Sequence, residues 1–161
     1  MVRLLVLALF SLPVCAADLE ANKKKVVEFY EQAINKKDFD AAAKYLGPRY
    51  IQHNPTAPDG AEGLKGFIGF LKSKFPNSKS EIKRAFAEGD YVILHVHAVR
   101  EPGTRGRAII DIFRLENGKI VEHWGISDNL GLLDDLGFIP PGSVPAFSPD
   151  KVDPQFRAAV S

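Results

Sequence analysis

The sequence predicts one domain of the α+β class, with helices in its first half and antiparallel strands in its second half. Two observations carry this prediction. Apolar residues recur at helical spacing up to Phe75, and their period changes to two from Ser78 onward. The dipeptide Asn117-Gly118 also separates two alternating segments, which is the strongest short signal for a β-hairpin. Helices followed by hairpins favour helices packed on one face of a sheet.

The first 17 residues have the features of a secretory signal peptide. A basic start at Arg3 precedes an apolar run from Leu4 to Leu12, and small residues at Ala16 and Ala17 suit a signal peptidase. A run of this length is too short to span a bilayer, which needs about 20 residues. We therefore expect a protein that is secreted or periplasmic and has no membrane contact after cleavage.

Three helices and one short extended segment are expected before the strands. The first helix runs over 18–37, and Asp38 caps a second that ends at Gly47-Pro48. Residues 50–53 are extended, and turn residues separate them from a third helix over 61–75.

Four strands and a proline-rich end complete the expected order. The strands are predicted over 82–88, 91–99, 108–115 and 119–127. Prolines recur beyond residue 139. The chain therefore divides into a signal peptide (1–17), one domain (18–139) and an extended C-terminal arm (140–161).

Composition excludes several classes of function. The chain has 21 Lys and Arg against 20 Asp and Glu, which argues against a nucleic-acid binder that neutralises phosphates. Its single Cys excludes a disulfide framework and a multi-cysteine metal site. It contains neither a GxSxG nucleophile motif nor a dinucleotide-binding fingerprint.

The predicted hairpin places two acids on one face of the sheet. If Asn117-Gly118 is a two-residue loop and alternation is unbroken, Asp111 lies opposite Trp124. Asp111, Phe113, Trp124, Ile126 and Asp128 then share a face, and His123 lies on the other. Because burying a carboxylate costs several kcal/mol unless it is paired, these acids indicate a functional pocket. A structural role stays open, in which Asp111 bonds a backbone or Arg group and Asp128 caps a turn.

A second candidate site lies on the strand over 91–99. His95 and His97 share a face, and with Glu101 they are close to the first metal-binding motif of cupins. The expected cupin second motif is missing, and the first half of the chain is helical. We therefore expect these histidines to lie on a partly solvated sheet face, with a cupin-like metal enzyme as the alternative.

Five segments in order resemble the SnoaL-like polyketide cyclase group of the NTF2-like superfamily. They are Tyr50-Ile51-Gln52-His53-Asn54-Pro55, Gly63, Ala87-Glu88-Gly89-Asp90-Tyr91-Val92, Asp111-Ile112-Phe113-Arg114 and Gly118-Lys119-Ile120-Val121-Glu122-His123-Trp124. The resemblance implies an NTF2-like cone, in which N-terminal helices pack on a strongly curved, mostly antiparallel sheet that encloses a pocket. It also implies a possible homodimer through the outer face of the sheet.

The same resemblance assigns a role to Asp128. SnoaL-type cyclases use an Asp shortly after the Trp of the last strand as general acid and base, and Asp128 follows Trp124 by four residues. The nearest subgroup has Asp directly after the Trp, where this chain has Gly125. The segment around Asp111 also resembles the strand of ketosteroid isomerases that carries a protonated Asp.

Together these observations predict cofactor-free acid–base catalysis on a small apolar carbonyl compound, by aldol-type cyclisation or isomerisation. Such chemistry needs a base near the carbon and a donor near the developing oxygen, and it requires no metal or organic cofactor. The alternative in the same pocket is a non-catalytic small-molecule binding protein. The expected catalytic residues are Asp128, Asp111 and His53, and the expected substrate-binding residues are Trp124, Phe113, Phe67, Tyr50, Asn54 and His97.

Overall fold

The computed structural model describes residues 16–55 and 57–127 of the chain. The predicted C-terminal arm, Asp128 and most of the predicted signal peptide lie outside the described residues. Within the described ranges, no helix is long and apolar enough to cross a membrane.

The first half of the described chain is helical, as predicted. Helix α1 (Ala16–Tyr30) continues into a π-helical segment, η1 (Glu31–Asn35), and the short helix α2 (Phe39–Ala43) follows. The side chain of Asp38 accepts a hydrogen bond from the backbone N–H of Ala41, which confirms its predicted role as an N-cap. The predicted second helix is too long, because strand β1 (Leu46–Gln52) already begins at Leu46.

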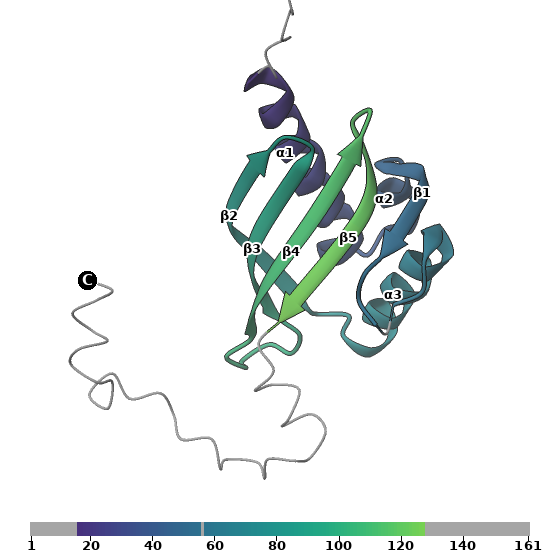
Figure 1. The fold of residues 1–161 in the computed structure, drawn as a ribbon. Coiled ribbons are helices and arrows are strands. Elements are labelled where there is room, and N and C mark those ends of the chain that lie inside the picture. The colour runs from purple at the N-terminus through teal and green to yellow at the C-terminus, as the bar shows by residue number, and fades with distance from the viewer. Residues whose placement is uncertain (1–15, 56, 128–161) are drawn as a thin grey trace, which may run out of the picture. The chain divides into compact units, whose positions relative to one another are not determined.

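Helix α3 (Gly60–Lys74) and four strands complete the fold: β2 (Lys79–Glu88), β3 (Tyr91–Val99), β4 (Arg107–Glu116) and β5 (Lys119–Ser127). The strands form one open, curved sheet in the order β1-β5-β4-β3-β2, with α1 behind β2 and β3 and with α3 beside β1 (Figure 1). All pairs are antiparallel except β1 with β5. This arrangement confirms the α+β prediction and makes the sheet mixed.

The hairpin between β4 and β5 turns where predicted, but it contains an irregularity that the sequence analysis missed. Asn117 and Gly118 have positive φ angles of 50° and 69°, and Glu116 pairs with Lys119. Leu115 then pairs with Ile120, whereas Arg114 pairs with Glu122, so Val121 is an extra residue in β5. Such a β-bulge shifts the alternation of every later residue in the strand.

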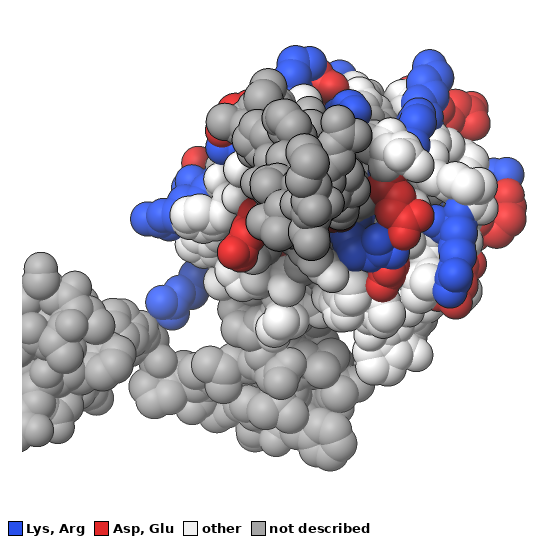
Figure 2. Space-filling model, turned by 45° about the horizontal axis from the view of Figure 1, so that its top comes forward, with Lys and Arg blue, Asp and Glu red and all other residues white. Residues whose placement is uncertain are grey.

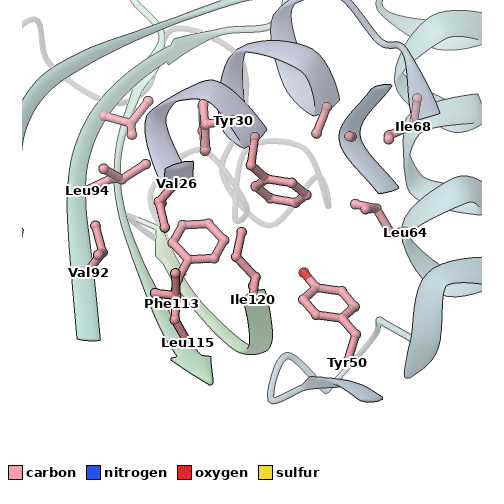
Figure 3. Close-up of a cluster of buried hydrophobic side chains, with 14 residues drawn as sticks. Val26, Tyr30, Tyr50, Leu64, Ile68, Val92, Leu94, Phe113, Leu115 and Ile120 are labelled. Carbon is pink, nitrogen blue, oxygen red and sulfur yellow. The ribbon is translucent and has the colours of Figure 1, made fainter. Parts of the chain in front are cut away.

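The hydrophobic core lies between the helices and the inner face of the sheet. Figure 3 shows Val26 of α1 close to Phe113 and Leu115 of β4, and Tyr50 reaching into the cluster with its hydroxyl end. Ile120 and Val121 are both buried, although they are consecutive in the strand. The bulge explains this burial, because it turns two successive side chains toward the core.

The surface carries charges of both signs without a single dominant patch on the face shown in Figure 2, where Lys and Arg alternate with Asp and Glu. Charged side chains of the described chain form exposed ion pairs, such as Lys83 with Glu81. This mixture agrees with the charge balance of the sequence.

Candidate functional site

Two ionisable side chains meet on the inner face of the sheet. Asp111 on β4 lies opposite Gly125 on β5, and Phe113 lies opposite His123. Asp111 and His123 are therefore diagonal neighbours, and Oδ1 of Asp111 is 3.0 Å from Nε2 of His123. Their side chains are only 9% and 13% exposed, respectively. The predicted pairing of Asp111 with Trp124 is wrong, because it assumed an unbroken alternation.

Strand β1 supplies the other hydrogen bond of the His123 ring. Oε1 of Gln52 lies 2.9 Å from Nδ1 of His123, and the amide nitrogen of Gln52 donates to the hydroxyl of Tyr50 over 2.9 Å. Gln52 and His123 are register partners in the parallel pair of β1 with β5, which brings these side chains together. Four side chains thus form one chain of hydrogen bonds: Tyr50, Gln52, His123 and Asp111.

The contacts of His123 suit it to share a proton with Asp111. The amide oxygen of Gln52 faces Nδ1 of His123, so it can accept a hydrogen from this nitrogen. Nε2 of His123 faces Oδ1 of Asp111, and a proton between these two atoms can lie on the imidazole or on the carboxyl group. Such a pair can donate a proton and recover it.

Two tyrosines lie close enough to feel the charge of Asp111. Burial raises the pKa of the Tyr50 hydroxyl, and the negative charge of Asp111 raises this pKa further. Burial and Asp111 raise the pKa of Tyr30 in the same way. Both phenols therefore keep their protons at neutral pH and surround the pair with neutral groups.

Aromatic and amide groups complete the surroundings of the pair. The ring of Phe113 stacks on His123 with centroids 4.7 Å apart, and Phe29 packs edge-on against Phe113. Oδ1 of Asn54 accepts a hydrogen bond of 2.8 Å from the backbone N–H of Gly125. The structure thus places four predicted site residues on this side of the sheet: Asp111, Phe113, Tyr50 and Asn54.

Two other predicted site residues lie on the opposite face. Trp124 pairs with Ile112, and its ring stacks on His53 with centroids 4.1 Å apart. Nε2 of His53 lies 2.8 Å from a carboxylate oxygen of Glu122, which also pairs with Arg114. The expectation that Trp124 shares a face with Asp111 is wrong, for the same reason: the bulge at Val121 turns it outward.

The histidines of β3 also lie away from the inner face. Nδ1 of His95 is 3.1 Å from the guanidinium of Arg84, and the ring of His97 bonds the carbonyl oxygen of Arg105. A cationic neighbour opposes metal binding at His95. Among residues 16–55 and 57–127, no group of three or more His, Cys, Asp or Glu side chains is arranged to hold a metal. The cupin-like alternative on His95, His97 and Glu101 is wrong for this helical and open-sheet fold.

The remaining candidates are separate from the pair. Phe67 is 44% exposed on α3, so its predicted role in substrate binding stays a prediction. Asp128 lies outside the described residues. A surface hollow of about 860 Å³ lies near η1 and the start of β2 and is lined by His97, Ser78 and neighbouring residues, but by neither Asp111 nor His123.

His123 and Gln52 were missed as candidates by the sequence analysis. Unbroken alternation places His123 on the face opposite Asp111, and the sequence pattern identifies Gln52 only as part of an extended segment. The consecutive apolar residues Ile120 and Val121 were the available signal, because two neighbouring buried residues in an alternating strand indicate a bulge.

Comparisons with known proteins agree with the fold. A family model described as SnoaL-like polyketide cyclase matches residues 24–136. The fold is similar to that of a proposed polyketide cyclase from Bacillus cereus, with 25% identity over 78% of this chain and 87% of that chain and a TM-score of 0.66. No curated protein matches the chain.

Two further solved structures share the fold. AclR, a proposed hydroxylase from Streptomyces galilaeus, is 22% identical over 76% of this chain and 99% of that chain, with a TM-score of 0.62. An NTF2-like protein of unknown function from Cytophaga hutchinsonii is 24% identical over 70% of this chain and 94% of that chain, with a TM-score of 0.58. At these identities the likeness concerns the fold alone, and the reaction has to be argued from the site.

Proposed function

This chain belongs to the SnoaL-like polyketide cyclase family, and we propose that it catalyses proton transfer at a carbon next to a carbonyl group, with Asp111 and His123 as the acid–base pair. Cyclisation by aldol addition and isomerisation both begin with this step. The substrate class we propose is a small, mostly apolar carbonyl compound.

The observation that carries the proposal is the 3.0 Å contact between Oδ1 of Asp111 and Nε2 of His123. A general acid–base group must hold its proton where the environment lets it leave and return. The pair is buried yet retains 9% and 13% of its side-chain surface, and Gln52 fixes the ring through Nδ1. The pair can therefore give its proton to a substrate oxygen and accept one from carbon. No step of this scheme requires a cofactor.

Exchange of substrate protons with deuterated water tests the proposal. The protein is incubated in deuterated water with a panel of small apolar ketones, and deuterium next to the carbonyl is measured by NMR. We expect exchange with at least one ketone, and we expect Asp111→Asn to lower its rate by about 10²- to 10⁴-fold, the usual contribution of an acid–base group.

A matched control is available on the opposite face of the sheet. His95→Gln changes a partly exposed histidine that has no contact with the pair, so it should leave the exchange rate unchanged. His123→Gln should lower the rate as Asp111→Asn does. If both variants of the pair kept the wild-type rate, the assignment would be wrong. Ligand binding without any exchange would instead support the alternative of a binding protein.

Asp128 is proposed as a second acid–base group, on the strength of its position four residues after Trp124. Asp128→Asn should then lower the exchange rate in a variant that retains Asp111. A rate within a factor of two of wild type would remove Asp128 from the mechanism.

Export and self-association are also proposals. The basic start, the apolar run and the small residues of 1–17 support cleavage and export, which N-terminal sequencing of the protein from the medium or periplasm tests. Exposed apolar side chains on the outer side of the sheet, such as Ile126 at 60%, support a homodimer, which light scattering tests.

A further inference from the structure

The amide group of Asn54 has a fixed orientation, and its two donors have no partner among the described residues. Its Oδ1 accepts a hydrogen bond from the backbone N–H of Gly125, so the other end of the amide must be Nδ2. No group in the described ranges accepts a hydrogen bond from Nδ2. Asn54 is half-buried rather than fully buried.

Gly125 brings this amide and the acid of the proposed pair to one place. A Cβ added to Gly125 would lie 2.9 Å from Nδ2 of Asn54 and 3.1 Å from Oδ1 of Asp111. Both polar atoms therefore lie beside the bare Cα of Gly125 and are no farther apart than the sum of these distances. They form no hydrogen bond with each other among the contacts of the described chain.

A donor and an acceptor within this limit are near enough for one oxygen atom to contact both. We propose that Asn54, Asp111 and the bare Cα of Gly125 form a binding site for a single hydroxyl or enol oxygen of the ligand. Nδ2 of Asn54 donates to that oxygen, and the hydroxyl group donates to Oδ1 of Asp111. Gly125 determines the specificity, because any side chain at this position enters the space between the two groups.

This site deepens the proposed function and rests on it for its role in the reaction. When a proton leaves the carbon next to a carbonyl group, negative charge develops on the oxygen, and a preorganised donor stabilises it. Asn54 supplies that donor without having to turn, since Gly125 already holds its oxygen. The substrates we infer are enolisable ketones or phenols on an apolar frame.

Binding of two matched aromatic probes tests the site. 2-Naphthol carries one hydroxyl group, and 2-methylnaphthalene has nearly the same shape without a donor or acceptor. We expect the wild-type protein to bind 2-naphthol at least about tenfold more tightly, and we expect 2-naphthol alone to shift the side-chain amide resonances of Asn54 in NMR spectra. Equal affinities for the two probes would overturn the inference.

Three variants identify the residues responsible. Asn54→Asp keeps an oxygen for the Gly125 N–H but removes both donors, so it should abolish the preference for 2-naphthol. Gly125→Ala should abolish the same preference while the affinity for 2-methylnaphthalene stays within about threefold. The control is Gly66→Ala on α3, where an added Cβ meets no atom within 4 Å, and it should preserve the preference. A preference that persists in both Asn54→Asp and Gly125→Ala would contradict the proposed site.

The probe assay tests the oxygen-binding site, and the deuterium assay tests the acid–base pair, so either proposal can be wrong without the other. Exchange at carbon without any preference for 2-naphthol would overturn this site and leave the proposed acid–base pair intact. A preference for 2-naphthol without exchange at carbon would support the site and overturn the proposed catalysis.

Discussion

The interaction between Asp111 and His123 can be measured directly by a double-mutant cycle. Asp111→Leu and His123→Phe each leave one buried polar side chain without its partner, which costs about 1–3 kcal/mol. The double variant replaces both groups by apolar ones and leaves neither unsatisfied. Because the side chains are only 9% and 13% exposed, we expect a coupling energy of about 1.5–3 kcal/mol at pH 7.

The assay is urea unfolding of the wild-type protein, both single variants and the double variant. The control cycle uses Lys83→Ala and Glu81→Ala, an ion pair with a shorter separation of 2.6 Å but with 40% and 67% exposed side chains. Its coupling should not exceed about 1 kcal/mol, because water screens exposed pairs. A coupling below about 0.5 kcal/mol between Asp111 and His123 would refute the reasoning, since distant sites show values of that size.

Four further predictions concern pH and the glycines. His53 and Arg114 lower the pKa of Glu122 below its usual 4.5, so the ionised Glu122 stabilises the fold fully above pH 4.5. The difference in free energy of unfolding between wild type and Glu122→Gln, measured with urea, should therefore shrink as the pH falls through the lowered pKa. A difference that stays constant with pH would contradict this. The raised pKa of Tyr50 gives the opposite pH dependence, because its phenol stabilises the fold only while it is protonated. Raising the pH above about 10 should therefore destabilise wild type more than Tyr50→Phe. Gly118→Ala should lower the free energy of unfolding by about 1–2 kcal/mol in the same assay, because the φ angle of Gly118 is +69°. Gly66→Ala on the exposed face of α3 should raise the free energy of unfolding by up to about 1 kcal/mol.

The order of the helices and strands was predictable from local signals. Asp38 caps its helix as expected, and the turn at Asn117-Gly118 pairs Glu116 with Lys119. The strand predicted over 91–99 has the bounds found in the structure. These features depend on residues close together in the sequence, for which capping and turn preferences are strong.

The composition of the site was less predictable because it depends on register. One extra residue, Val121, reverses the face of Trp124 and His123, and the consecutive apolar residues Ile120 and Val121 indicate such a bulge without fixing its register. The contact of Gln52 with His123 depends on the parallel pairing of β1 with β5, which joins segments 71 residues apart. Asp111 was identified because a carboxylate on a buried face needs a partner, whatever that partner is.

NMR of the His123 ring nitrogens tests the central claim most directly. In protein labelled with ¹⁵N at histidine, we expect Nδ1 to carry a hydrogen that is bonded to Gln52, and we expect a second proton between Nε2 and Asp111 that is lost in Asp111→Leu. An Nδ1 without hydrogen in the wild-type protein at neutral pH would contradict the shared proton and, with it, the acid–base role of the pair.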